Sequence, residues 1–171
     1  MNANNNQINE EKNLGKLPIW NLKDLYYSQN DKRLIKDLNI IKNETTKFEK
    51  KYLKKVKFLT ADNLFKAIFR LEKIDILMDK ILSYAHLLVA ENGNNEKNKI
   101  FYQQMQEKIT NYASSIIFFT LELNQISEKQ HRELIKNKNL KKYKNWIAIK
   151  RSFKSHQLDL NIEKILQDKN I

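Results

Sequence analysis

The chain has three histidines, the side chains best suited to bind a metal or to transfer a proton near neutral pH. They are His86, His131 and His156, which lie far apart in the sequence. A zinc-peptidase helix carries His-Glu-x-x-His, so that two imidazoles reach one metal from successive turns. None of the three histidines is followed by glutamate. We therefore expect His86 in a core or at its rim, His131 at an exposed helix start and His156 in an irregular link.

Three carboxylates form a second candidate site. Glu72, Asp75 and Asp79 are spaced three and four residues apart, which places them on one face of a helix. Such a group could transfer protons or bind a metal. Several lysines lie in the same stretch, so a solvated face of ion pairs is the stronger expectation.

Glu122 stands in the apolar segment Phe118–Leu123. A carboxylate there either faces water on the opposite side of the helix or is buried and paired. We expect a salt bridge with a lysine or arginine at the boundary of the core. Glycine occurs only at positions 15 and 93 and cysteine is absent, which excludes a glycine-rich phosphate loop and a thiol nucleophile. We assign no catalytic, metal-binding or cofactor-binding residue to the sequence.

The elements that position these residues are predicted to be helices. The 171 residues contain two glycines and one proline, too few for the turns of a β-rich fold. The length fits one domain, and a hydrophobic fraction of 41% suffices for a core.

No apolar run approaches the roughly 20 residues of a membrane span. The N-terminus lacks the apolar segment of a secretory signal, and the absence of cysteine agrees with a cytoplasmic protein.

The longest predicted element is an antiparallel helical hairpin over about residues 60–126. Its polar turn is Glu91–Asn95, and Thr60 is the expected cap of the first arm. Apolar residues repeat every three or four positions along both arms. In the first arm they are Leu64, Ile68, Leu71, Ile74, Met78, Ile81, Ala85 and Leu88. In the second arm they are Tyr102, Met105, Ile109, Tyr112, Ile116, Phe119, Leu123 and Ile126. Seams of this length, joined by so short a turn, should pack against each other.

The segment before the hairpin should contain a tail and one long helix. Residues 1–16 are polar and rich in asparagine, which predicts a disordered tail. Residues 17–171 form the predicted helical domain, with Trp20 as its first large anchor. A helix from Asp31 to Leu53 should follow, capped by Ser28 or Asn30.

Two to three shorter helices should follow the hairpin. They are expected over about residues 127–136, 140–153 and from residue 159 onward. The predicted fold is thus all-α, a multi-helix array built on the long antiparallel hairpin.

The formal net charge of +12 admits an anionic partner such as nucleic acid or a membrane surface. The chain has only four arginines, however, whereas surfaces that read bases usually depend on arginine. The lysines occur along every predicted helix, with one short cluster at Lys50–Lys55. A compositional origin of the charge is therefore preferred, which disfavours a nucleic-acid partner, and no membrane partner is expected. Two alternatives stay open, a basic helical nucleic-acid binder and a coiled-coil adaptor that captures a partner helix.

A resemblance to a known family rests on short motifs that occur in order. Trp20–Tyr26 is similar to the Trp–Leu–Asp–Leu–Tyr entry of the oligoendopeptidase F type of peptidase. Leu82–Leu87 resembles that family's Ser–Tyr–Ala segment, and Phe118–Leu123 resembles its phenylalanine-rich, glutamate-containing turn. His156–Leu158, followed by Glu163–Leu166, resembles the ending of the same region. The order and spacing match from about residue 17 to residue 169.

The resemblance implies an almost wholly helical, cytosolic zinc metallopeptidase, related to thimet oligopeptidase, that cleaves short peptides in a deep channel. The resembled region is the N-terminal helical part, which walls or lids the channel. The family's zinc site lies downstream, in a His-Glu-x-x-His helix and a later glutamate. No zinc or catalytic residue therefore carries over to this sequence.

From this resemblance we expect an N-terminal domain that is incomplete at its C-terminus and inert alone. The implied partners are the missing catalytic half and, in the complete enzyme, an oligopeptide substrate. Zinc is the cofactor of the family and not of this chain. A domain of this kind should expose an apolar face, which would favour self-association.

Overall fold

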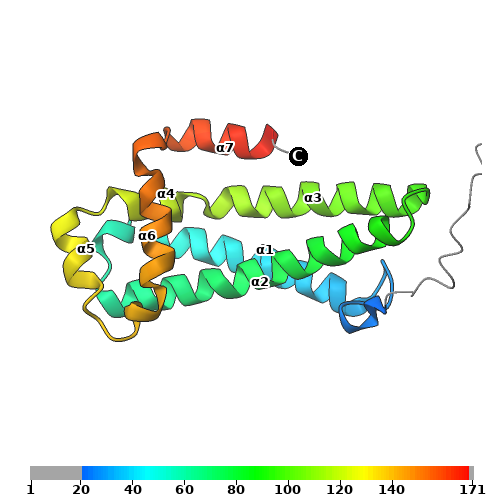
Figure 1. Cartoon of the computed structure of the whole chain (residues 1–171), viewed down its shortest axis with the longest axis horizontal. Coiled ribbons are helices and arrows are strands. Elements are labelled where there is room, and N and C mark those ends of the chain that lie inside the picture. Colours follow the sequence, from blue (N-terminus) through cyan, green and yellow to red (C-terminus); the bar gives the residue numbers. More distant parts are fainter. Residues whose placement is uncertain (1–20, 170–171) are drawn as a thin grey trace, which may run out of the picture.

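A computed structural model describes residues 21–169 of the chain. Within this range the ordered elements are helices, and no strand is present, so the all-α prediction is confirmed (Figure 1). The predicted tail at residues 1–16 and the anchor Trp20 lie outside the described residues.

The first long helix, α1, spans Lys32–Tyr52. It follows a short 3-10 helix, η1, at Leu22–Asp24. Its cap is Asp31, whose carboxylate accepts hydrogen bonds from the backbone N–H groups of Tyr27 and Arg33 at 2.7 Å. The expected caps, Ser28 and Asn30, are not used, because the acidic side chain one residue later accepts from both sides of the helix start. The buried stripe of α1 is Leu34, Ile41, Thr45, Phe48 and Tyr52.

The hairpin arms α2 (Ala61–Glu91) and α3 (Glu96–Ile116) run side by side, with α1 packed against both (Figure 1). Thr60 caps α2 by accepting from the backbone N–H of Asn63, as its sequence position indicates. Asn95 caps α3 by accepting from two backbone N–H groups. The predicted seams form the core: seven of the eight residues named for the first arm are buried, as are six of the eight named for the second. Within the described residues these seams are satisfied by the chain itself, which leaves no free seam for a coiled-coil partner.

The second arm is not one helix, because α3 ends at Ile116 and α4 (Phe118–Gln125) begins after a turn residue. The hydroxyl of Ser115 donates to the carbonyl oxygen of Tyr112 at 2.7 Å, one turn earlier. Side-chain hydrogen bonds of this kind compete with the helical ladder and bend helices. The apolar periodicity crosses the interruption unchanged, since Phe119, Leu123 and Ile126 are buried as predicted.

The remaining elements pack across one end and one side of the three long helices (Figure 1). They are η2 (Val56–Phe58), α5 (Glu128–Leu134), η3 (Leu140–Tyr143), α6 (Lys144–Ser152), η4 (Phe153–His156) and α7 (Leu160–Lys169). Helix α6 contacts α4, η3 and η4, and α7 lies along α3. This order agrees with the two to three short C-terminal helices expected after the hairpin.

Candidate functional site

The three carboxylates singled out in the sequence line a groove beside α6. One cavity of about 360 Å³ lies between α2, η3 and α6. Its lining is Ile68, Leu71, Glu72, Asp75, Ile76, Asp79, Lys142, Tyr143 and Trp146. A second cavity, of about 370 Å³, shares Asp75 and Asp79 and continues toward α3 and Gln167 of α7. We call the two together the acidic groove.

Glu72 is held at one wall of the acidic groove. Its carboxylate accepts a hydrogen bond of 2.7 Å from the Tyr143 hydroxyl. Burial and this bond to a carboxylate raise the pKa of Tyr143. The ammonium of Lys142 lies 4.6 Å from the Tyr143 ring centre and also faces the rings of Phe65 and Phe69. The tyrosine therefore stays neutral and acts as a hydrogen-bond donor that orients Glu72.

Asp75 lies between Glu72 and Asp79 in the acidic groove and has a raised pKa. Burial, reinforced by the neighbouring charge of Asp79, raises the pKa of Asp75 to about 6, while Lys150 of α6 opposes the shift. A carboxyl with this pKa can accept or release a proton near neutral pH. The two aspartates can equally receive an ammonium or guanidinium group, because a cation that enters the acidic groove would relieve their repulsion.

The three histidines do not line the acidic groove, and they stand on three different elements. His86 is exposed on α2, with its ring centre 5.7 Å from that of Tyr102. His131 is half-buried in α5, and burial lowers its pKa. His156 is exposed at the end of η4. The position expected for His156 agrees with the structure, whereas His86 is more exposed and His131 is less exposed than predicted.

The donor atoms present do not fit a zinc ion. Within residues 21–169 no group of three histidine, cysteine, aspartate or glutamate side chains lies close enough to hold a metal. Zinc requires three or four convergent ligands, usually including imidazole nitrogen, and the three histidines stand on three different elements.

Glu122 does not form the expected salt bridge. Its carboxylate accepts hydrogen bonds from the backbone N–H groups of Lys54, at 2.5 Å, and Val56, at 3.1 Å. These groups belong to the connection between α1 and α2, where Lys54 adopts a left-handed conformation with φ of 62°. The sequence indicated that Glu122 is paired. Its partners are backbone N–H groups 66 to 68 residues earlier in the chain, and the pattern of charged side chains does not reveal such partners.

Two side chains that the sequence analysis did not single out anchor α4. The guanidinium of Arg151, in α6, donates to the carbonyl oxygens of Leu123 and Ile126 at 2.9 Å and pairs with Glu128. The amide of Gln157 accepts from Asn124 at 2.9 Å and donates to the carbonyl oxygen of Leu121 at 3.2 Å. Carbonyl groups at a helix end lack the full set of helical partners, so Arg151 supplies a donor to Ile126 and a second donor to Leu123, which also accepts from the backbone N–H of Ile126. The chain uses lysine for most of its positive charges, so an arginine at position 151 was the sequence feature that could have pointed to a specific contact.

No helix among the described residues is both long enough and apolar enough to span a bilayer.

The comparison with protein families finds one match. The peptidase M3 N-terminal family, described as oligopeptidase F, matches residues 122–171, less than a third of the chain. No curated protein and no solved structure gives a match. The matched segment begins at Glu122 and contains Arg151, Gln157 and all of α5, α6 and α7. The resemblance indicated by the motifs is confirmed at this level: over residues 122–171 the chain is similar to the N-terminal region of an oligoendopeptidase F-like peptidase.

Proposed function

We propose that this chain is a helical wall of the peptide channel in an oligoendopeptidase F-like zinc peptidase that acts on short peptides. The observation that carries the proposal is the family match, because the matched helices α6 and α7 border the acidic groove. In this proposal the wall limits access to peptides that fit the channel. Like the family, the protein would work in the cytoplasm.

The acidic groove suits a peptide that carries positive charge. Asp75 and Asp79 can attract an N-terminal ammonium or a basic side chain, and Trp146 and Ile76 offer apolar surface beside them. Peptide recognition in such grooves combines a few charged contacts with apolar area. The walls α2 and α6 are helices, which keep the spacing of these groups fixed.

Catalysis is assigned to another part of the enzyme. The sequence contains no His-Glu-x-x-His, and its described donor atoms do not fit zinc. The chain alone is therefore proposed to be inert, with the catalytic part as its partner. Helix α7 offers a surface for that partner, because it has no buried residue and exposes Ile162, Ile165 and Leu166.

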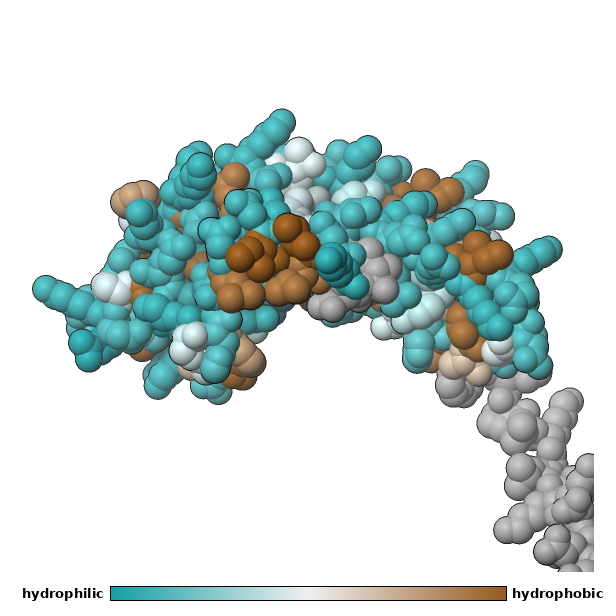
Figure 2. Space-filling view, turned by 90° about the horizontal axis from the view of Figure 1, so that it is seen from above, coloured by the Kyte–Doolittle hydropathy of each residue, from teal (hydrophilic) through white to brown (hydrophobic). Residues whose placement is uncertain are grey.

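Figure 2 shows the apolar side chains of α7 gathered in one patch on a mostly hydrophilic face. Patches of this kind mark contact sites in soluble proteins. The same patch is proposed to cause self-association when the catalytic part is absent.

The test has two arms. Purified chain, incubated with a mixture of fluorogenic oligopeptides and zinc, is expected to yield no cleavage product and to retain no stoichiometric zinc after gel filtration. Zinc-dependent cleavage by the chain alone would overturn the assignment of catalysis to another part.

The second arm measures binding of a fluorescein-labelled peptide with a free N-terminus and two lysines. Asp75→Asn with Asp79→Asn should weaken this binding, whereas Glu91→Gln with Glu107→Gln removes the same charge outside the acidic groove and should not. Equal effects of the two pairs would argue against the acidic groove as a peptide site.

A further inference from the structure

The positive charge of the chain is concentrated in two segments. Residues 128–154 contain ten lysines and arginines against two glutamates. Residues 50–57 contain five lysines and no acidic residue. The net charge of the two segments together, +13, accounts for all of the chain's +12, so the remaining residues nearly balance. Lysines occur along most helices, but outside these two segments acidic residues balance them, so the net positive charge lies in the two segments.

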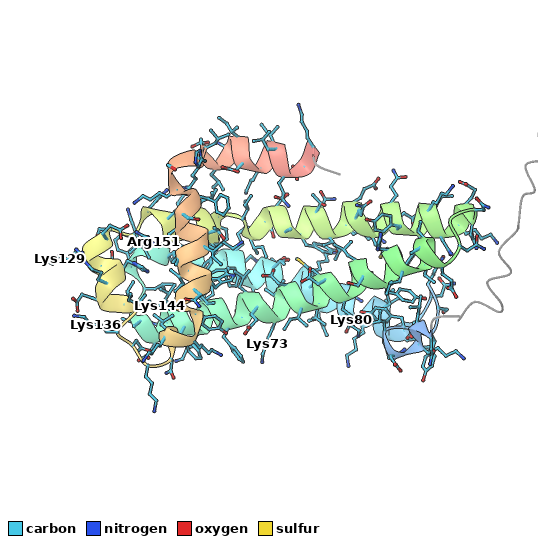
Figure 3. The ribbon with its side chains drawn as sticks, viewed as in Figure 1. Lys73, Lys80, Lys129, Lys136, Lys144 and Arg151 are labelled. Atoms are coloured by element: carbon cyan, nitrogen blue, oxygen red, sulfur yellow. The ribbon has the colours of Figure 1, made fainter. Side chains whose placement is uncertain are left out.

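The fold brings these two segments to the same end of the molecule. The side-chain amide of Gln130 in α5 donates to the carbonyl oxygen of Lys57 at 2.7 Å. The side-chain amide of Asn137 donates to Asp62, in the first turn of α2, at 3.0 Å. Figure 3 shows Lys129, Lys136 and Lys144 at this end, whereas Lys80 lies well away from it. We call this surface, formed by residues 50–57 and 128–154, the basic end.

Most of the cations of the basic end are accessible and carry no acidic partner. Among the described residues, the ion pairs of the two segments are Lys136 with Glu133, Arg151 with Glu128 and a long contact of His131 with Glu128. Exposed side chains without an ion pair in this range include Lys50, Lys51, Lys54, Lys55, Lys57, Lys129, Arg132, Lys138, Lys141, Lys142, Lys144 and Lys154. Mutual repulsion among so many like charges destabilises the free protein and is relieved by a polyanion.

Aromatic rings accompany the cations. Phe58 in η2 is 73% exposed, and the ammonium of Lys57 lies 5.0 Å from its ring centre. Phe69 is also exposed and stacks on Phe65, and both rings are faced by Lys142. Exposed rings beside lysines are the combination on which the bases of a single strand stack while its phosphates are neutralised.

The arrangement favours nucleic acid over a membrane. Proteins that bind an anionic membrane through one helix carry apolar and basic residues on the two faces of that helix. Here the aliphatic patch lies on α7, outside the two basic segments, and α5 exposes no large hydrophobic side chain. The exposed apolar side chains of residues 128–154, Ile149 in α6 and Phe153 in η4, stand on two different elements and do not form the apolar face of one helix. With Arg132 as the one exposed arginine of the basic end, contacts with phosphate predominate and base-specific contacts are few.

We propose that the basic end binds the phosphate backbone of single-stranded nucleic acid without sequence preference. Phe58 supplies a stacking platform for a base. This surface is separate from the acidic groove, and the proposal stands independently of the peptidase assignment.

The test compares two fourfold variants of equal net charge. In the first variant four lysines are replaced by glutamine, Lys55 from residues 50–57 and Lys129, Lys141 and Lys144 from residues 128–154. Lys32, Lys36, Lys97 and Lys108, all exposed on α1 or α3, are replaced by glutamine in the control. Affinity for a fluorescein-labelled oligo(dT) of about 20 nucleotides, long enough for one binding site, is measured by anisotropy over a range of salt concentrations.

The basic-end variant should lose at least about tenfold in affinity at low salt. The slope of log affinity against log salt concentration should become shallower by up to about 3, because each of the four lost phosphate contacts contributes about 0.7. The control should stay within about twofold of the parent, because it keeps the contacts and loses only long-range attraction. Equal losses in both variants, or no binding by the parent at low salt, would overturn the proposal.

Two further arms test the kind of partner. Phe58→Ala should weaken binding of the single strand and leave binding of a duplex unchanged. Preference for the duplex, or binding to phosphatidylserine vesicles without binding to oligo(dT), would also overturn the proposal. The thermal melt of each variant serves as the folding control, and the paired variants Lys55→Gln with Lys129→Gln and Lys141→Gln with Lys144→Gln replace a fourfold variant that does not fold.

Discussion

The carboxylate of Glu122 lies 2.5 Å from the backbone nitrogen of Lys54, a residue 68 positions earlier in the chain. This contact joins α4 to the connection between α1 and α2, and it holds Lys54 in the left-handed region. Glu122 is also the first residue of the family match. The hydrogen bond thus connects the matched segment to the long helices.

Replacement of Glu122 by glutamine should destabilise the protein by about 1–3 kcal/mol, because a charged acceptor of two backbone N–H groups is exchanged for a neutral amide. Urea denaturation gives the free energy of unfolding. Glu91→Gln, at the exposed end of α2, is the control and should change stability by less than about 0.5 kcal/mol. A loss in the Glu122 variant no greater than that of the control would contradict the role given to the contact.

Lys54→Gly should stabilise the chain by up to about 1 kcal/mol, because glycine adopts a positive φ without the steric cost that a side chain pays. Lys55→Gly is the matched control, since Lys55 has a φ of −122° and gains nothing from glycine. Chemical denaturation of both variants should therefore give changes of opposite sign. A destabilised Lys54→Gly variant would show that the left-handed conformation is not retained in solution.

Arg151→Met should destabilise the protein by about 1–3 kcal/mol, because it removes the hydrogen bonds from the guanidinium to the carbonyl groups of Leu123 and Ile126, of which only Leu123 keeps another donor, the backbone N–H of Ile126. Methionine keeps the apolar stem, so the loss reports the guanidinium. Arg132→Met removes an exposed arginine from the same end of the molecule and should be nearly neutral. Thermal melts of similar midpoint for the two variants would contradict the anchoring of α4 by Arg151.

The stability of the chain should respond to Asp75 with a definite sign. Its pKa of about 6 in the folded protein exceeds the ordinary unfolded value of about 3.9, so the folded state binds the proton more tightly. The contribution of Asp75 to stability therefore falls as the pH rises from about 4 to 6, and the full penalty applies above that range. Partial exposure limits the penalty to about 1–2 kcal/mol.

Asp75→Asn should accordingly stabilise the protein at pH 8 and have little effect at pH 4, when compared with the parent at each pH. Asp24→Asn, in the exposed helix η1, removes a carboxyl outside the acidic groove and is the control. Denaturation curves at the two pH values measure the difference. An equal effect of Asp75→Asn at both would refute the shifted pKa.

Self-association should depend on α7. Ile165→Glu places a charge in the patch of α7, whereas Ile100→Glu places it at an equally exposed isoleucine of α3. Sedimentation velocity over a range of concentrations should show weaker association for Ile165→Glu than for the parent and for Ile100→Glu. A parent protein that stays monomeric throughout would contradict the prediction.

The local features of the fold were predictable from the sequence. Apolar periodicity located the hairpin, because burial of one helix face repeats every three to four residues whether or not the helix is interrupted. The interruption at Ile117 was not predicted, because it leaves the apolar periodicity of the second arm intact. The cap Thr60 was predictable, since it acts on its own helix.

Features that depend on distant residues were predicted less well. Arg151 and Gln157 act on α4 across 25 to 36 residues, and local pattern does not encode such contacts. Composition offered one indication. In a chain that uses lysine for most positive charges, Arg33, Arg70 and Arg151 each pair with a carboxylate through the planar group that lysine lacks. The basic end was missed for a related reason, because its two segments meet only in the folded protein.

Helix α7 has no buried residue, and its carboxylates accept hydrogen bonds from the Ser114 hydroxyl, at Asp168, and from the backbone N–H of Leu158, at Glu163. In native-state hydrogen exchange its amides should therefore open without the rest of the chain, long before those of α2, whose inner face is fully enclosed. The wall proposed for a peptide channel would then consist of a rigid part, formed by α2 and α6, and of α7 as an edge that can detach. Docking of a partner on α7 would slow that exchange, and the order of amide protection would report assembly without an activity assay.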